Sequence, residues 1–179
     1  MAPLTDADGP DVRADLAPGR RFPDLELPDH SGIVRRLSEL AEGDPMVVTF
    51  FRGWWCPKEQ AFFRGLVALQ EEMEVAYSRL VSVSVDEPIA LSAFRAGLGA
   101  RWTFLSDARR GYVDALGLLE TTDTLHRPYV PTTFTLRPDL GIHTVYNGYW
   151  FWGRPTKEDL RRDLRMITRA ARPDWEVPR

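Results

Sequence analysis

Residues 46–60 read MVVTFFRGWWCPKEQ, and a strand-to-helix junction is visible within them. The first six residues form a continuous β-branched and aromatic run, which is typical of a central strand buried on both faces. After Cys56 the period changes, and apolar side chains recur at the spacing of one helix face: Phe62, Leu66, Leu69 and Met73. We therefore predict a helix over 57–76, with Pro57 in its first turn.

The rest of the chain continues this alternation. Strands are predicted at 80–85, 102–105, 132–136 and 142–146, the last two as a hairpin, and a short edge strand at 22–27. Helices are predicted to follow three caps: Asp86, either Ser106 or Asp107, and Thr156. Strands that alternate with helices favour βαβ units. We predict an α/β fold with a central mixed β-sheet flanked by helices.

The chain of 179 residues is long enough for one domain. Residues 1–19 are rich in Asp, Pro, Gly and Ala without periodicity, so we expect a flexible N-terminal arm. The domain itself is expected over 20–172. Pro173 stops the final helix and begins a C-terminal tail over 173–179.

The charge balance excludes several classes of partner. The chain carries 23 Lys and Arg against 26 Asp and Glu, a net charge of −3, so no nucleic acid is expected. A membrane-spanning helix needs about 20 apolar residues, and the longest such run, near 46–51, is far shorter. The first twenty residues carry four aspartates and do not resemble a secretory signal. We expect a cytoplasmic protein that does not bind membranes.

Cys56 is the only cysteine, which excludes an internal disulfide, a Cys-x-x-Cys pair and a Cys-rich zinc site. The three histidines stand far apart, so neither a metal nor an organic cofactor is expected. At a helix N-terminus the macrodipole stabilises a thiolate. Arg52 and Lys58 could add to this effect, and Glu59 would oppose it. The residues alone leave two interpretations: a reactive thiol, or a buried cysteine that acts as a small hydrophobe.

Residues 51–57, Phe-Arg-Gly-Trp-Trp-Cys-Pro, resemble the active-site segment of peroxiredoxin-like proteins of the AhpC/TSA class, within the thioredoxin superfamily. The resemblance extends over about residues 19–172, through weaker matches at 22–29, 83–86, 105–107, 115–117 and 130–134. It implies a thioredoxin-like sandwich. The segment 130–134 resembles the loop in which thioredoxin folds keep a cis-proline facing the cysteine.

The resemblance implies that Cys56 is a peroxidatic cysteine, which attacks a hydroperoxide and becomes a sulfenic acid. An external thiol reductant must then restore it, a one-Cys mechanism, and family habit suggests a homodimer. Arg52 is the second expected catalytic residue. The expected substrate-binding residues are Trp55, Pro57, Pro131, Thr132 and Thr133.

Two positions depart from the family pattern. Peroxiredoxins place Thr or Ser three residues before the cysteine, where this chain has Gly53, and an arginine where it has Pro131. Arg52, or less strongly Arg127, is the candidate replacement for that arginine. Thr132 or Thr133 is the candidate for the missing hydroxyl. Glu59 stands where thioredoxin-type relatives have a second cysteine, which excludes dithiol exchange within the chain.

Two other functions stay open. Because the Thr and Arg are missing, Cys56 could form mixed disulfides without fast attack on peroxides. Alternatively, the aromatic segment 146–153, with Tyr149, Trp150 and Trp152, could make the protein a non-enzymatic partner-binding module. The simpler interpretation of that segment is ordinary packing between the hairpin and the last helix.

Overall fold

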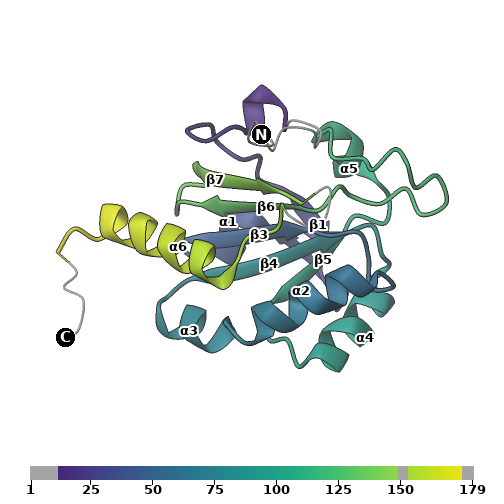
Figure 1. The fold of residues 1–179 in the computed structure, drawn as a ribbon, viewed down its shortest axis with the longest axis horizontal. Helices are drawn as coiled ribbons and strands as arrows, with labels where there is room; N and C mark the ends of the chain where they lie inside the picture. Colours follow the sequence, from purple (N-terminus) through teal and green to yellow (C-terminus); the bar gives the residue numbers. More distant parts are fainter. Residues whose placement is uncertain (1–11, 149–152, 175–179) are drawn as a thin grey trace, which may run out of the picture.

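The computed structural model describes residues 12–148 and 153–174. Its main sheet has five strands in the order β5-β4-β3-β6-β7 (Figure 1). Three of them are parallel: β3 (Met46–Phe50), β4 (Arg79–Ser84) and β5 (Thr103–Ser106). Strand β6 (Thr132–Leu136) pairs antiparallel with β3 and forms an antiparallel hairpin with the edge strand β7 (Ile142–Asn147). The predicted mixed central sheet and its closing hairpin are confirmed.

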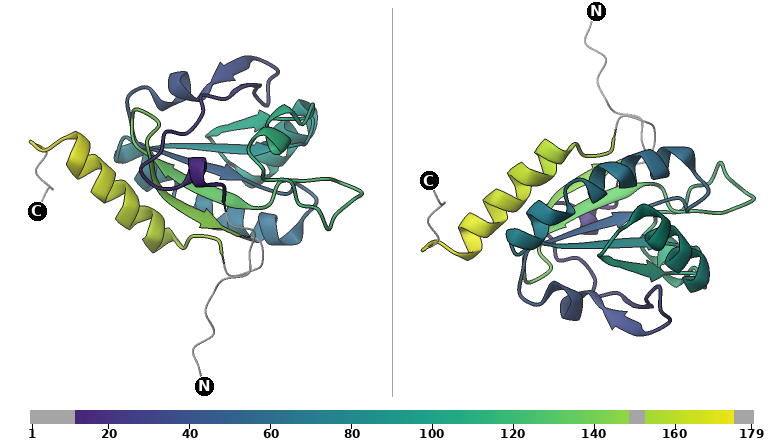
Figure 2. Two further views of the ribbon diagram at one scale, coloured as in Figure 1. Left: turned by 90° about the horizontal axis from the view of Figure 1, so that it is seen from above. Right: turned by 90° about the horizontal axis from the view of Figure 1, so that it is seen from below.

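Both faces of this sheet are covered (Figures 1 and 2). One face carries the helices α2 (Pro57–Val67), α3 (Gln70–Val75), α4 (Pro88–Leu98) and α6 (Lys157–Ala171). The other carries α1 (Leu37–Ala41), α5 (Gly111–Ala115), the short 3-10 helix Ala14–Leu16 and a small hairpin, β1 (Glu26–Pro28) with β2 (Val34–Arg36). The arrangement is the predicted thioredoxin-like sandwich.

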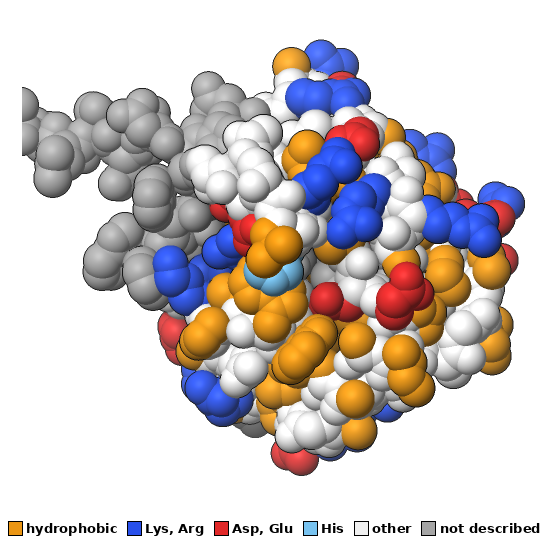
Figure 3. All heavy atoms as spheres, turned by 90° about the vertical axis from the view of Figure 1, so that its right-hand side faces the viewer, with side chains coloured by type: hydrophobic (Ala, Val, Ile, Leu, Met, Phe, Trp, Pro, Cys, Tyr) orange, Lys and Arg blue, Asp and Glu red, His pale blue; other side chains and the backbone are white. Residues whose placement is uncertain are grey.

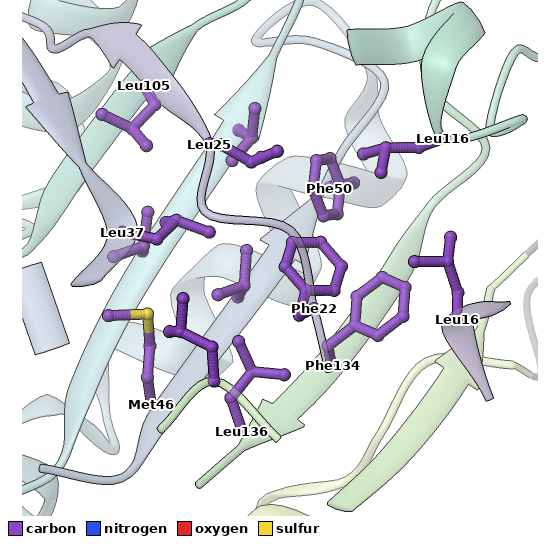
Figure 4. Packing of buried hydrophobic residues seen from close by; sticks show 14 of the residues in the cluster. Leu16, Phe22, Leu25, Leu37, Met46, Phe50, Leu105, Leu116, Phe134 and Leu136 are labelled. Carbon is purple, nitrogen blue, oxygen red and sulfur yellow. The ribbon is translucent and has the colours of Figure 1, made fainter. Parts of the chain in front are cut away.

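Alternation along β3 divides the core into two clusters. Met46, Val48 and Phe50 pack on the α1 face, whereas Val47 and the following Phe51 pack on the α2 face. Strand β3 is fully buried, as the continuous apolar run predicts. Figure 4 shows the first cluster, in which the rings of Phe22, Phe50 and Phe134 gather from three separate segments.

The predicted edge strand at 22–27 is wrong in its extent. Only β1 forms, from Glu26, and it pairs with β2 rather than with the main sheet. Pro23 has no N–H to donate to a ladder, and the carbonyl of Leu25 accepts the N–H of Leu37 at the start of α1. Phe22 and Leu25 are nevertheless buried in the core.

The single helix predicted over 57–76 is two helices, because α2 ends at Val67 and α3 begins at Gln70. Gln70 explains the break. Its amide donates to the carbonyl of Gly99 at 3.3 Å and accepts the N–H of Arg101 at 3.1 Å. The chain turns so that this buried side chain satisfies both backbone groups after α4.

The N-terminal arm is shorter than predicted within the described residues. Leu16 is 2% exposed and belongs to the core, and the N–H of Gly19 donates to the carbonyl of Ile142 at 2.9 Å. Residues 12–19 are therefore part of the packed domain. Residues 1–11, and 175–179 of the predicted tail, lie outside the described residues.

Of the predicted helix caps, Thr156 is confirmed at the N-cap position, whereas the N-cap of α5 is Arg110 and Asp107, three residues before Arg110, reaches the first N–H groups of that helix. Thr156 forms a capping box with Asp159, and Asp107 accepts the N–H groups of Gly111, Tyr112 and Val113 at the start of α5. Asp86 does not cap α4, whose N-cap is Glu87. Its carboxylate is occupied instead by Ser84 and by the turn that carries Cys56.

Among the described residues, no helix is both long and apolar enough to cross a bilayer.

Candidate active site

Cys56 lies at the carboxyl edge of the parallel strands, in a hydrogen-bonded turn between β3 and α2. Its N–H donates to the carbonyl of Gly53 at 3.2 Å, and its own carbonyl accepts the N–H of Gln60 at 3.1 Å. Cys56 is the N-cap residue of α2, is 4% exposed and forms no disulfide. Its thiol therefore stands at the positive end of a helix of 11 residues.

Glu59 ties this turn to the beginning of α2. Its Oε1 accepts the backbone N–H of Arg52 at 3.2 Å and Nη2 of Arg154 at 2.7 Å. Burial raises the pKa of the Glu59 carboxyl, and the charge and hydrogen bond of Arg154 oppose that rise. Arg154 thus offsets the negative charge that the sequence places beside Cys56.

The guanidinium of Arg52 turns towards the loop between α5 and β6. Its Nη2 donates to Oδ2 of Asp123 at 2.8 Å, and its Nε is buried without a partner among the described residues. Asp123 also accepts the N–H of His126 at 3.0 Å and lies 3.0 Å from its Nδ1. The pKa of Asp123 is lowered, first by that backbone N–H and then by the His126 ring and Arg52.

Trp55 lies within this group of side chains. Its indole stacks on the His126 ring with the centroids 4.0 Å apart, and the Arg52 guanidinium is 5.2 Å from the Trp55 ring centroid. Figure 3 shows the side of the molecule towards which the loop between α5 and β6 projects in Figure 1, and a histidine side chain lies there among hydrophobic ones. The three side chains and Asp123 form one cluster beside the cysteine turn, which we call the Trp55 cluster.

The edge of the indole that carries Nε1 is packed against Gly53. A Cβ on residue 53 would lie 2.4 Å from Nε1, and Gly53 has a φ of +149°, which L residues rarely adopt. Only glycine fits at this position while Trp55 keeps its place.

The threonines predicted to bind substrate already have partners. Thr132 lies opposite Phe50 and donates from Oγ1 to the carbonyl of Val130 at 3.1 Å. Thr133 pairs with Thr49 through their hydroxyls at 3.0 Å inside the sheet. Both side chains are buried, at 1% and 3% exposure.

The predicted prolines flank the site from two sides. Pro57 is exposed at the first position of α2, and buried Pro131 immediately precedes β6. Arg127, the weaker candidate for the missing arginine, is exposed in the loop that carries His126.

Asp86 supports the turn from the end of β4. Its Oδ2 accepts the N–H of Trp54 at 3.2 Å and the hydroxyl of Ser84 at 2.8 Å. Burial raises its pKa, while those hydrogen bonds lower it. The cysteine turn is thus held by carboxylates on both sides, the half-buried Asp86 and the buried Glu59.

The sequence model of the AhpC/TSA family matches residues 18–145. The chain belongs to the AhpC/TSA family. A Mycobacterium tuberculosis protein whose name assigns it provisionally to the peroxiredoxins is 32% identical over 130 residues, which are 71% of this chain and 82% of the relative. Peroxiredoxins of this family are thiol peroxidases.

Solved structures share the AhpC/TSA fold of this chain. The peroxidoxin BcpB of Mycobacterium tuberculosis has a TM-score of 0.71 at 22% identity, with 90% of this chain and 99% of that chain covered. The AhpC of Enterococcus faecalis has a TM-score of 0.70 at 17% identity, with 89% and 98% covered. The Prx3 of Vibrio vulnificus, solved in complex with hydrogen peroxide, has a TM-score of 0.72 at 19% identity, with 83% and 98% covered.

Against the AhpC/TSA pattern, the structure corrects one expectation and explains one departure. The peptide before Pro131 is trans, since no peptide bond among the described residues is cis. Where relatives have Thr or Ser, Gly53 leaves room that the Trp55 indole occupies.

Sequence reasoning missed Asp123, His126 and Arg154. The spacing of Asp123 and His126 suits a turn in which the carboxylate accepts the N–H three residues later, a local signal. Arg154 stands 95 residues from Glu59, and nothing local in the sequence marks that pair.

Proposed function

We propose that this AhpC/TSA protein is a thiol-dependent peroxidase that uses Cys56 in a one-Cys mechanism. The Cys56 thiolate attacks the terminal oxygen of a hydroperoxide, an S–O bond forms and the O–O bond breaks. Two electrons pass from sulfur to oxygen, and the leaving oxygen takes up a proton to become water or an alcohol. Cys56 is left as a sulfenic acid.

The observation that carries this proposal is the place of the only cysteine. Cys56 occupies the N-cap of α2, at the positive end of the helix dipole, and the Glu59 carboxylate in the first turn is paired with Arg154. Its low exposure suits a small oxidant better than a bulky one. Membership of the AhpC/TSA family supports the same chemistry.

The return step needs a reductant from outside the chain, because the sequence has no second cysteine. One thiol condenses with the sulfenic acid, releasing water and forming a mixed disulfide. A second thiol then attacks that disulfide and restores the Cys56 thiol, while the two external thiols become a disulfide. The reductant and a homodimeric assembly are both proposals.

The test compares the protein with Cys56→Ser, which keeps the size and polarity of the capping side chain. Peroxide consumption in the presence of excess dithiol is expected to disappear in the variant. A sulfenic-acid trapping reagent is expected to label the parent protein after one equivalent of peroxide. Equal consumption by both proteins would contradict the proposal.

A second candidate, a thiol oxidoreductase that forms mixed disulfides, is favoured by Gly53 and Pro131, which replace the usual Thr and Arg. It predicts that Cys56 reacts quickly with a small disulfide and slowly with hydrogen peroxide. Comparing the two second-order rate constants on one preparation separates these chemistries.

The third candidate, a partner-binding module, depends on Tyr149, Trp150 and Trp152, which lie outside the described residues. It stays a prediction from the sequence.

A further inference from the structure

We propose that the indole N–H of Trp55 is a catalytic hydrogen-bond donor, which holds the hydroperoxide and stabilises the leaving oxygen during attack by Cys56. The inference rests on the proposed peroxidase function and adds a residue to it. It assigns Trp55 a defined chemical task rather than a general place in the substrate pocket.

The first support is position. Residues 53–56 form one turn, closed by the bond from the Cys56 N–H to the Gly53 carbonyl. The three Trp55 atoms nearest to a Cβ built on Gly53 are Nε1, Cδ1 and Cε2, at 2.4, 3.0 and 3.1 Å. The nitrogen edge of the indole therefore lies inside the turn that presents the cysteine.

The second support is an unused donor. Among the described residues, Nε1 of Trp55 has no hydrogen-bond acceptor, whereas Nε1 of Trp102 donates to the Ser82 hydroxyl at 2.8 Å. Tryptophan N–H groups usually find a partner when the ring is packed. A substrate oxygen would supply the acceptor that the Trp55 N–H lacks.

The third support is the commitment of the competing hydroxyls. Thr132 donates to a backbone carbonyl, and the Thr133 hydroxyl is paired with Thr49 inside the sheet. Neither is free to replace the hydroxyl that Gly53 lacks. Arg52 keeps a buried Nε without a partner among the described residues, and its guanidinium lies against the Trp55 ring, so it is a second donor beside Trp55.

The fourth support is rigidity. The Trp55 ring is stacked on His126, and His126 is fixed by Asp123, which also holds Arg52. A donor fixed before the reaction needs little reorganisation when charge develops on the leaving oxygen. His126 and Asp123 are therefore positioning residues for the Trp55 donor.

The test replaces Trp55 with phenylalanine and with 3-benzothienylalanine, an isostere that has sulfur in place of the indole N–H. Stopped-flow oxidation of Cys56 by hydrogen peroxide gives the second-order rate constant, and the pH dependence of alkylation gives the thiol pKa. We expect both substitutions to slow oxidation by about tenfold to a hundredfold, because one preorganised donor is lost. The alkylation pKa is expected to stay unchanged.

Trp54→Phe is the matched control, since its neighbouring indole is 49% exposed and makes no contact with the Trp55 cluster among the interactions described. It is expected to oxidise at the parent rate. His126→Ala should slow oxidation, and His126→Phe, which can still stack on Trp55, should recover part of the loss.

Two results would overturn the inference. One is an unchanged oxidation rate in the benzothienyl protein, and the other is an equal slowing of oxidation and alkylation, which would make Trp55 a packing residue only. Failure of the peroxidase proposal looks different, because the parent protein would then react with peroxide no faster than Cys56→Ser.

Discussion

Glu59 and Arg154 show how much a single pair of residues contributes at this site. Their ion pair is buried, with the side chains 1% and 11% exposed, and Oε2 of Glu59 and Nε of Arg154 have no partner among the described residues. Removing one member of such a pair leaves an uncompensated charge, whereas removing both is often neutral. The pair therefore specifies the geometry of the cysteine turn more than it adds stability.

At this residue, Arg154→Met is expected to lower the free energy of unfolding by about 3 kcal/mol, because Glu59 loses its cation. The double variant Glu59→Gln/Arg154→Met is expected to recover most of that loss. Urea unfolding of the four proteins of the cycle measures both values. Additive losses in the double variant would show that the two side chains do not act together.

Asp29 gives a prediction for acid stability. Burial would raise its pKa, but hydrogen bonds from Ser31 and Arg35 and backbone N–H groups lower it to about 2. The folded-state pKa lies below the ordinary value of 3.8, so Asp29 stabilises the fold above that value and loses the contribution as pH falls towards 2. Asp29→Asn should therefore flatten the fall in melting temperature between about pH 4 and pH 2. A parallel fall in both proteins would contradict this.

At the scale of the elements, helix α2 contains a glycine, Gly65, that lowers its stability. A Cβ built on Gly65 would meet no atom within 4 Å, so close packing does not require the glycine. Its only local effect is the loss of helix propensity, which costs about 1 kcal/mol relative to alanine.

Gly65→Ala is accordingly expected to raise the free energy of unfolding by about 1 kcal/mol without changing the reactivity of Cys56. Gly53→Ala is the contrasting variant, because its φ of +149° and the Trp55 indole exclude a side chain. It should be destabilised. Chemical denaturation of both variants measures the two changes in the free energy of unfolding. If Gly65→Ala leaves the free energy of unfolding unchanged, a packing constraint at Gly65 must offset the gain in helix propensity.

The elements also show what sequence periodicity can and cannot predict. The buried run before Cys56 defined β3, since burial on both faces is written in consecutive residues. The break between α2 and α3 depends on Gln70 binding backbone groups at Gly99 and Arg101, 29 and 31 residues away. Asp86 was misjudged for a similar reason, because its partner Trp54 precedes it by 32 residues.

At the scale of the whole molecule, the core extends into the segment that composition assigned to a flexible arm. Leu16 packs in the cluster on the α1 face, in the part of the sheet formed by β6 and β7 (Figure 4). The prediction rested on the average composition of residues 1–19, in which Leu16 belongs to no sustained apolar repeat at helix or strand spacing.

Leu16→Ala is expected to lower the free energy of unfolding by about 3 kcal/mol, as for a buried leucine elsewhere in a core. Leu125→Ala, at a side chain that is 83% exposed, is the control and should stay within about 0.5 kcal/mol of the parent. Thermal unfolding of the two variants and the parent protein gives the melting temperatures that test this prediction. Equal melting temperatures for Leu16→Ala and the parent protein would mean that residues 12–19 behave as the flexible arm that composition predicts.

The candidate site also has one part that the local sequence predicts and another part that only the fold reveals. The position of Cys56 at a strand-to-helix junction could be predicted because the whole junction lies within fifteen residues, 46–60. Its supporting side chains, Asp123, His126 and Arg154, arrive from distant segments through the sheet topology. The local sequence located Cys56, and only the fold located the side chains that surround it.

The contact between Gly53 and Trp55 also constrains how this site can change over generations. A threonine at position 53 is sterically excluded while the indole stays in place, and loss of the indole alone leaves empty the space that it fills beside Gly53. We therefore expect each substitution to be harmful on the background of the other residue, a pattern known as reciprocal sign epistasis. The residues at positions 53 and 55 are then expected to change together rather than one at a time.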